Sequence, residues 1–150
     1  MGRSDQCNEQ TVAQSSMLIP DFSEYSLALF EENRLIFSSS DAGLRPLFES
    51  LDHCAGKTGL ILHDKVIGLA AAKLIVYTAI IAEVIAGVVS VPAMKFLEDN
   101  IIVISARHVV SNIMTRDRSA VCPGEVIALN TEDPADFIRQ IKTMLDGQRK

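Results

Sequence analysis

The chain has 150 residues, of which 48% are hydrophobic and 5% are aromatic, with no tryptophan. A chain of this length can bury a full core in one domain, so neither a structural metal nor a disulfide is required. The formal net charge is -5, and no stretch combines clustered basic residues with aromatic ones, which argues against a nucleic-acid partner.

The start of the chain predicts a tail followed by a β-hairpin. Residues 1–16 are polar and aperiodic, so we expect a mobile tail there and a single domain over 17–150. Two apolar segments, 26–30 and 35–38, flank a polar link of four residues. This pattern predicts two antiparallel strands joined as a hairpin.

The middle of the chain predicts helices alternating with strands. Leucine and phenylalanine recur at helical spacing over 44–51, and Pro46 falls in the first turn of this short helix. An apolar strand is expected over 59–63. Asp64 then follows as a helix N-cap, with the helix itself expected over 65–77.

The strand and helix unit repeats in the second half. A strand rich in β-branched residues is expected over 84–89, with Ser90 as the next cap and Pro92 early in a helix over 93–98. Another strand is expected over 101–105.

The last element predicted is an amphipathic helix that starts at Asp133 and Pro134. Its apolar face consists of Phe137, Ile138, Ile141 and Leu145. A hairpin followed by alternating helices and strands indicates the α/β class, as a three-layer α/β/α domain with a mixed sheet.

The apolar run over 66–91 is long enough to span a bilayer. Lys73 and Glu83 interrupt it, so we expect a buried helix and strand and no membrane partner. The chain has an odd number of widely spaced cysteines and no signal-peptide pattern. Both observations favour a cytoplasmic location.

Four separated segments resemble a known family. They are Tyr25-Ser26-Leu27 with Leu35-Ile36-Phe37-Ser38-Ser39; Gly43-Leu44-Arg45-Pro46-Leu47; Asp64-Lys65-Val66-Ile67-Gly68-Leu69-Ala70-Ala71-Ala72; and Arg116-Asp117 with Cys122-Pro123-Gly124-Glu125. From about Tyr25 to the last helix, the chain resembles an uncharacterised domain-of-unknown-function family of small bacterial proteins. The resemblance implies a cytidine-deaminase-like fold that lacks the zinc site, and a homo-oligomer, since deaminase-like folds are commonly oligomeric.

The sequence can be tested for zinc-dependent deamination. That chemistry needs a His or Cys ligand with a catalytic Glu close behind it, and a cysteine pair three positions apart. His53, His63 and His108 are followed two positions later by alanine, lysine and valine, and no two cysteines lie three apart. We therefore expect no metal site, no cofactor and no deaminase activity.

A ligand site is expected where two helices begin. Arg45 and Lys65 would lie near helix N-termini at adjacent strand ends, where free N–H groups favour anions. The sequence thus predicts a small anionic or nucleotide-like ligand. In the alternative interpretation, Asp64 only caps its helix and Lys65 is solvated.

The segment over 115–125 is the second part of the predicted site. Pro123 suits a first helical position, and Glu125 suits the positive end of the helix dipole. We expect the part over 116–125 to converge with the helix start at Asp64 and Lys65. The predicted ligand-binding residues are Arg45, Asp64, Lys65, Arg116, Asp117, Cys122 and Glu125.

Two other functions remain open from the sequence. Cys122 at a helix start could be a thiolate nucleophile, with Arg116 or Arg118 stabilising negative charge and Asp117 or His108 transferring a proton. A lone cysteine is more commonly a small buried hydrophobe. In a structural role, the apolar residues over 80–91 would pair with a second copy, although the same residues equally suit a core.

Overall fold

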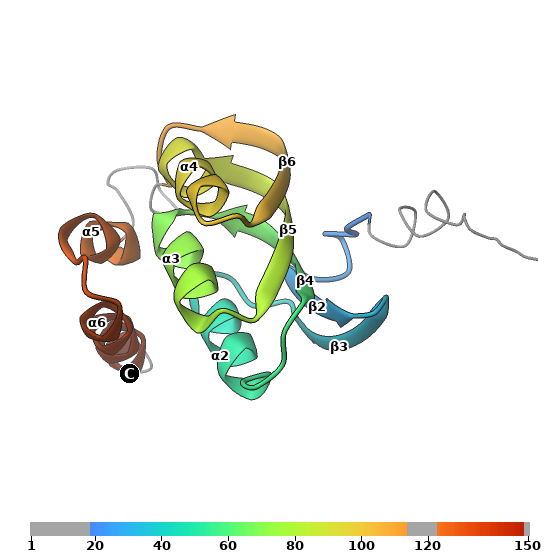
Figure 1. Cartoon of the computed structure of the whole chain (residues 1–150), viewed down its shortest axis with the longest axis horizontal. Helices are drawn as coiled ribbons and strands as arrows, with labels where there is room; N and C mark the ends of the chain where they lie inside the picture. Colours follow the sequence, from blue (N-terminus) through green and yellow to red (C-terminus); the bar gives the residue numbers. More distant parts are fainter. Residues whose placement is uncertain (1–18, 114–122, 149–150) are drawn as a thin grey trace, which may run out of the picture.

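A computed structural model describes residues 19–113 and 123–148 (Figure 1). The described elements are β2 (Leu27–Glu31), β3 (Arg34–Ser39), α2 (Arg45–His53), β4 (Leu60–Ile67), α3 (Leu69–Thr78), β5 (Ile81–Ser90), α4 (Val91–Asp99), β6 (Val103–Val110), α5 (Pro123–Asn130) and α6 (Pro134–Gln148). The strands form one sheet in the order β3-β2-β4-β5-β6. Since β2 is antiparallel to both neighbours while β4, β5 and β6 are parallel, the expected α/β class and mixed sheet are confirmed.

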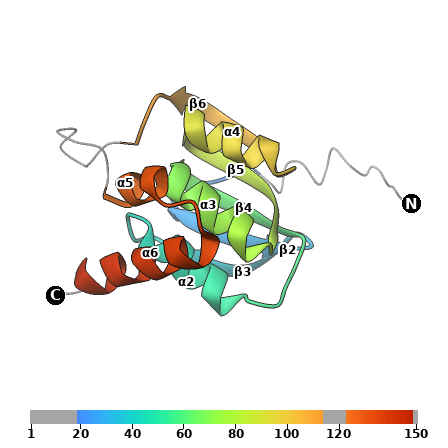
Figure 2. The same cartoon turned by 60° about the vertical axis from the view of Figure 1, so that its left-hand side comes forward.

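The described helices all lie on one side of the sheet (Figures 1 and 2). Helices α2, α3 and α4 pack on the strands, and α5 and α6 pack against α3 from outside. The α/β/α layering expected from the sequence is therefore not seen in residues 19–113 and 123–148. Here the second group of helices covers the first group instead of the opposite face of the sheet.

The hairpin and the first helix agree with the sequence pattern. Strands β2 and β3 are joined by Glu32 and Asn33, whose φ angles of 50° and 68° are both positive. Positive φ at both central residues matches the right-handed twist of paired strands, so the turn is two residues long instead of four. Helix α2 carries Pro46 in its first turn and buries Leu47 and Leu51.

The connection between β4 and α3 differs from the prediction. The strand continues to Ile67, and the helix begins at Leu69 with Gly68 as its N-cap. Asp64 is therefore not a helix cap, and the prediction that it caps this helix is wrong. The β-branched side chains of Val66 and Ile67 favour the strand, which pairs with β5 up to its last residue.

Helix α3 lies at the centre of the core. Every residue from Leu69 to Ile75 is buried, because the sheet covers one side of the helix while α4 and α5 cover others. A helix that is apolar all round is expected to be enclosed in this way. In the described part of the chain, no helix is long and apolar enough to cross a membrane.

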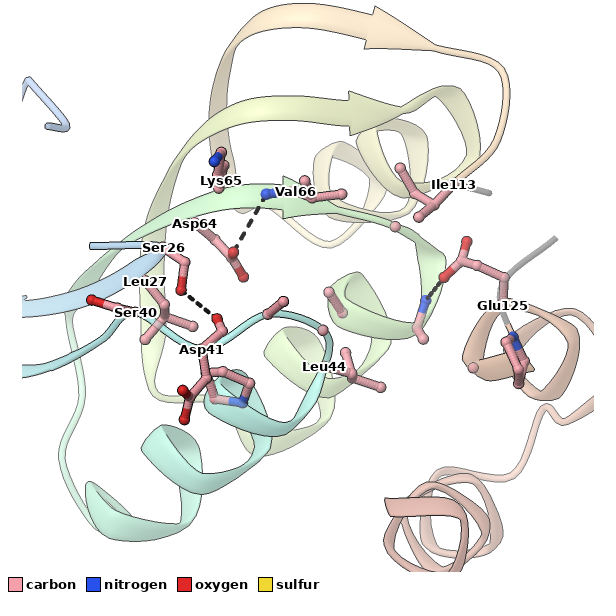
Figure 3. Close-up of a pocket in the computed structure, with 18 residues that line it drawn as sticks. Ser26, Leu27, Ser40, Asp41, Leu44, Asp64, Lys65, Val66, Ile113 and Glu125 are labelled. Carbon is pink, nitrogen blue, oxygen red and sulfur yellow. Dashed lines mark hydrogen bonds between the residues drawn. The ribbon is translucent and has the colours of Figure 1, made fainter. Parts of the chain in front are cut away.

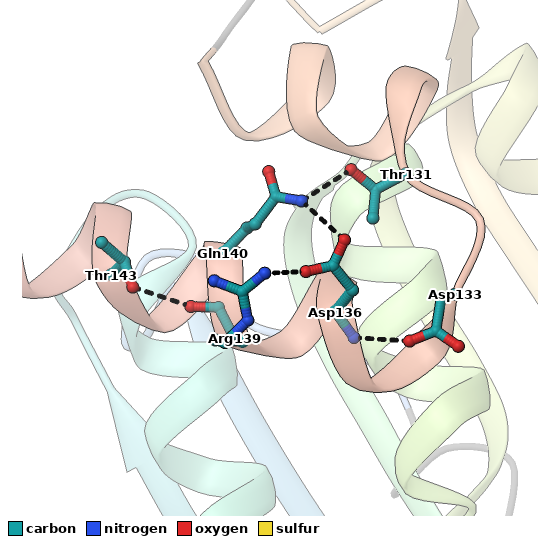
Figure 4. A network of polar contacts seen from close by, with 6 residues as sticks. All are labelled: Thr131, Asp133, Asp136, Arg139, Gln140 and Thr143. Carbon is teal, nitrogen blue, oxygen red and sulfur yellow. Dashed lines mark hydrogen bonds and ion pairs between the residues drawn. The ribbon is translucent and has the colours of Figure 1, made fainter.

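Local capping signals are confirmed in the second half. The Ser90 hydroxyl accepts the N–H of Ala93 at 3.3 Å at the start of α4. The Asp133 carboxylate accepts the N–H of Asp136 at 2.9 Å at the start of α6, and Asp136 in turn contacts Arg139 (Figure 4). Strand β6 begins and ends later than the predicted strand over 101–105.

Most of the apolar residues over 80–91 belong to the core of β5. Phe137, Ile141 and Leu145 of α6 are also buried, as the shared face predicts. Cys54 lies in this core with 2% of its surface exposed. The sequence around it is polar, but the end of α2 turns the thiol inward.

Candidate functional site

A pocket of about 560 Å³ lies at the carboxyl end of β4 (Figure 3). At β4 the sheet changes from antiparallel pairing with β2 to parallel pairing with β5. Open α/β sheets bind ligands in the crevice beyond the carboxyl ends of their parallel strands. The pocket is lined by Ser26, Leu27, Ser40, Asp41, Ala42, Gly43, Leu44, Pro46, Asp64, Lys65, Val66, Gly68, Ala70, Ala71, Ile113, Pro123, Gly124 and Glu125.

One wall is the connection between β3 and α2, which Ser26 holds in place. The Ser26 hydroxyl lies 3.0 Å from the carbonyl oxygen of Ser39 and 2.6 Å from that of Asp41. The Asp41 N–H donates to the Ser39 hydroxyl at 3.1 Å. These bonds tie the connection to the first residue before β2, so the wall is fixed to the sheet.

The opposite wall contains Glu125, which caps a neighbouring helix. Its Oε2 accepts the N–H of Leu69 at 2.8 Å, and its Oε1 accepts the N–H of Ala70 at 2.7 Å. The side chain is buried, and the positive end of the α3 dipole favours its negative charge. Glu125 lies in the first turn of α5, as predicted, but its carboxylate binds α3.

Gly68 allows this close approach. A Cβ atom at Gly68 would lie 2.6 Å from Oε1 of Glu125 and 2.8 Å from Cγ1 of Ile113. Neither distance is compatible with ordinary van der Waals contact. A glycine at the N-cap is therefore required for Glu125 to reach the helix.

Lys73 holds the other end of α5 and was not predicted as a site residue. Its ammonium group donates to the carbonyl oxygens of Ala128 at 2.6 Å and Thr131 at 2.8 Å. It also lies 5.7 Å from the ring centre of Phe137. Burial lowers the pKa of Lys73, partly offset by the charge of Glu132. A cation among the last carbonyls of a helix is favourable, so α3 binds both ends of α5.

Asp64 also lines the pocket, but its carboxylate has weaker hydrogen bonding than that of Glu125. Its Oδ1 accepts the N–H of Val66 at 3.4 Å, a long hydrogen bond. Burial raises the pKa of Asp64 to about 8, with backbone N–H groups acting in the opposite direction. Figure 3 shows the Asp64 side chain pointing into the pocket and Lys65 pointing to the other side of β4, as alternation along a strand requires.

The cationic rim predicted from the sequence does not form. Lys65 lines the pocket, but its side chain leaves the strand on the side opposite Asp64 (Figure 3). Arg45 donates to the carbonyl oxygen of Leu145 in α6 and lines a separate hollow of about 410 Å³. The prediction that Arg45 and Lys65 lie together at the ligand site is therefore wrong.

The remaining predicted residues have mixed outcomes. Arg116, Asp117, Arg118 and Cys122 lie outside the described residues, so their roles stay predictions. Glu125, at the end of that segment, lines the same pocket as Asp64 and Lys65, and this part of the expected convergence is confirmed. His108 is exposed on β6 and does not line the pocket.

Lys73 and Gly68 are the residues that sequence reasoning missed. A lysine inside an otherwise apolar helix signals a buried partner, because an ammonium group is seldom buried without one. A glycine between a strand and a helix likewise signals an N-cap. Both signals point to a contact, but neither identifies the partner.

The fold and pocket define an α/β domain with a mixed sheet and a ligand-sized site at the strand ends. A family model described as a domain of unknown function (DUF1893) matches residues 21–145, so the chain belongs to this family. The predicted membership of a domain-of-unknown-function family is thereby confirmed. The crystal structure of a DUF1893 family protein (TM1506) from Thermotoga maritima is similar, with a TM-score of 0.75 and 25% sequence identity over 95% of this chain and 93% of that chain. No curated protein matches the chain.

Proposed function

We propose that the protein binds a small molecule of about nucleoside size in the pocket at the carboxyl end of β4. The observation that carries this proposal is the cavity itself. Its volume of about 560 Å³ falls within the range of small-molecule sites, roughly 300 to 1,000 Å³. Its walls come from segments far apart in the sequence and are held by Ser26 and Glu125.

The domain is further proposed to be a deaminase-like fold that binds without zinc chemistry. A hairpin, a helix and then parallel strands joined by helices support the deaminase-like arrangement. The starts of α2 and α3 carry Arg45 with Pro46 and Leu69 with Ala70, which supply no zinc ligands. No group of three His, Cys, Asp or Glu side chains suited to a metal occurs in residues 19–113 and 123–148.

The charge of the ligand is where the proposal departs from the sequence prediction. An anion was expected at the start of α3, but Glu125 already accepts the N–H groups of Leu69 and Ala70. A phosphate or carboxylate there would have to displace a buried carboxylate. The described side chains therefore support a neutral or cationic ligand over an anionic one.

Nuclear magnetic resonance tests the proposal with adenosine, guanosine, cytidine and uridine as probes. We expect at least one nucleoside to shift the backbone amide signals of Ser26, Asp64 and Glu125. The Ala42→Trp variant fills the pocket from an exposed lining position, so it should lose these shifts. The matched Ala135→Trp variant lies at an exposed position on α6 and should keep them. Absence of shifts with all four nucleosides, or shifts that persist when the pocket is filled, would contradict the proposal.

Three other predictions stay open alongside this one. A cysteine-dependent reaction depends on Cys122, outside the described residues. Its test is the alkylation rate of the thiol, which for a reactive cysteine rises well below the ordinary pKa of about 8.5. Self-association is tested by native mass spectrometry of the purified protein, and a cytoplasmic location by cell fractionation.

A further inference from the structure

We propose that the pocket selects ligands carrying a cationic amidine or guanidine group, and that Asp64 is the residue that receives this group. This inference rests on the proposed function, because it names the ligand class for the same cavity. Two observations support this ligand class: the distribution of charge around the pocket, and the hydrogen bonds that each carboxylate already accepts from the protein.

The lining contains more acidic than basic groups. Asp41, Asp64 and Glu125 supply three carboxylates, and Lys65 is the one cationic residue among the described lining residues. Lys65 points to the opposite side of β4 from Asp64 (Figure 3). Among the described lining residues, negative charge therefore exceeds positive charge, which favours a cationic ligand.

Asp41 is exposed and Asp64 is half-buried, so Asp64 is the carboxylate that a ligand inside the cavity would meet away from bulk water. Both oxygens of Glu125 accept helix N–H groups at 2.7 and 2.8 Å. Asp64 accepts the Val66 N–H at a long 3.4 Å, with the Lys65 N–H as a second backbone donor, and no ion pair joins it to a cation in the described part of the chain. An amidinium group offers two parallel N–H donors that match a carboxylate in two short, charge-assisted bonds.

The fold leaves space for a planar group beside Asp64. The cavity that Asp64 lines is also lined by Ala70, Ala71 and Gly43, whose small size leaves it open. Leu44 and Pro46 supply apolar surface on the same side of the sheet. An aromatic or aliphatic body attached to the cation would bury its surface there, and each buried methylene contributes about 0.8 kcal/mol.

Binding of a cation should depend on pH through Asp64. Burial raises its pKa to about 8, so only about a tenth of the protein has the ionised form at pH 7. The charged groups that share its pocket are Asp41, Lys65 and Glu125, and its strand neighbours Leu27 and Ala86 do not ionise. Affinity for a cation therefore increases about tenfold between pH 7 and pH 9.

Three probes of the same shape test the inference: benzamidine, benzamide and benzoate, titrated into the full chain and followed by amide chemical shifts. We expect benzamidine to shift the Asp64 and Val66 amide signals and to bind at least tenfold more tightly than benzoate. Asp64→Asn, which keeps the side-chain shape, should reduce benzamidine affinity about tenfold at pH 9. Asp41→Asn, at the exposed lining position, should reduce it less than twofold.

The outcomes separate this inference from the proposed function. Benzoate binding as tightly as benzamidine, or benzamidine affinity unchanged in Asp64→Asn, would overturn the ligand class while leaving the pocket as a binding site. The same conclusion follows if the nucleosides bind and none of the three probes does. If neither the nucleosides nor the probes bind, both proposals are wrong.

Discussion

Glu125 and Asp64 are two carboxylates that line the same pocket and have different roles. Glu125 is enclosed between α5 and α3, and each of its oxygens accepts a short hydrogen bond from a helix N–H. Asp64 lies in the second half of β4, where its carboxylate has only backbone donors: the Val66 N–H at a long 3.4 Å and the Lys65 N–H. A carboxylate removed from water is expected to stabilise a fold when the fold itself satisfies its hydrogen-bonding capacity, as it does for Glu125.

The difference separates the structural role of Glu125 from the binding role that we propose for Asp64. Glu125 contributes to stability because it satisfies the helix donors of Leu69 and Ala70 and complements the helix dipole. Burial raises the pKa of Asp64, so we expect ionisation of this carboxylate to lower stability, because the backbone donors only partly replace the water that is lost. Retaining such a group is explained if a ligand supplies the missing bonds.

The largest expected effect comes from removing the space that Glu125 needs. Gly68→Ala would place a Cβ 2.6 Å from Oε1 of Glu125, so the carboxylate must leave α3 or the helices must separate. We expect a loss of about 3 kcal/mol in the free energy of unfolding, measured by urea denaturation. The control is Gly147→Ala in α6, where an added Cβ meets nothing within 4 Å and better helix propensity should raise stability slightly. Equal effects at the two glycines would contradict the account of Gly68.

Removing only the charge of Glu125 should lower the free energy of unfolding by less than Gly68→Ala does. Glu125→Gln keeps the side-chain shape but places an NH₂ group against one of the two N–H donors, so one bond becomes a repulsion. A loss of about 2 kcal/mol in the free energy of unfolding is expected, because hydrogen bonds to charged groups contribute about 1.5 to 3 kcal/mol. Glu98→Gln, at an exposed position in α4, should change stability by less than about 0.5 kcal/mol. If Glu125→Gln leaves the free energy of unfolding unchanged, the α3 cap has no energetic role.

Asp64→Asn, in contrast, should raise the free energy of unfolding. The folded-state pKa of Asp64 is raised to about 8 from its ordinary 3.8, so between these values the folded state holds a proton that the unfolded state has released. Stability therefore declines as pH rises from about 4 to about 8, and it levels off above that. Asparagine has no proton to lose, so the variant should lack this decline.

Urea denaturation of the Asp64→Asn variant between pH 5 and pH 9 measures this decline. At pH 8 the variant should exceed the natural protein by at least about 1 kcal/mol in the free energy of unfolding, since one pKa unit corresponds to 1.36 kcal/mol. Asp41→Asn provides the matched comparison at the exposed lining position. A variant with the same pH slope as the natural protein would show that Asp64 is well solvated.

The smallest effect is expected at Lys65, the cation that the sequence placed at the site. Its side chain is exposed and points away from Asp64 (Figure 3). Lys65→Met should change stability by less than about 0.5 kcal/mol and nucleoside affinity by less than twofold. A large loss of affinity, measured by isothermal titration, would instead place the ammonium group within reach of the ligand.

Features set by neighbouring residues could be predicted from the sequence. Ser90 and Asp133 cap helices through bonds to N–H groups three positions away, and such signals are visible in a short window. The hairpin and the mixed sheet follow from alternation and from the order of elements. The strand end at Ile67 was missed because Asp64 comes earlier in the chain and is a better N-cap residue than Gly68, the one that is used.

The contacts that build the site could not be predicted, because their partners are distant in the chain. Glu125 and Leu69 are 56 positions apart, and Lys73 and Thr131 are 58 apart. Local patterns identify Glu125 as a helix-start residue and Lys73 as a charged residue in an apolar helix. They contain no information about which helix packs against either residue. The direction of the Lys65 side chain likewise depended on the strand, which sequence reasoning ended too early.

The attachment of α5 to α3 at both ends has a consequence for how the family can vary. Because Glu125 and Lys73 set the place of α5, its position does not depend on the length of the connection that precedes it. Doubling a flexible connection costs only about 0.6 kcal/mol in loop-closure entropy. Insertions between Ile113 and Pro123 should therefore be tolerated without loss of the contacts that fix α5 on α3.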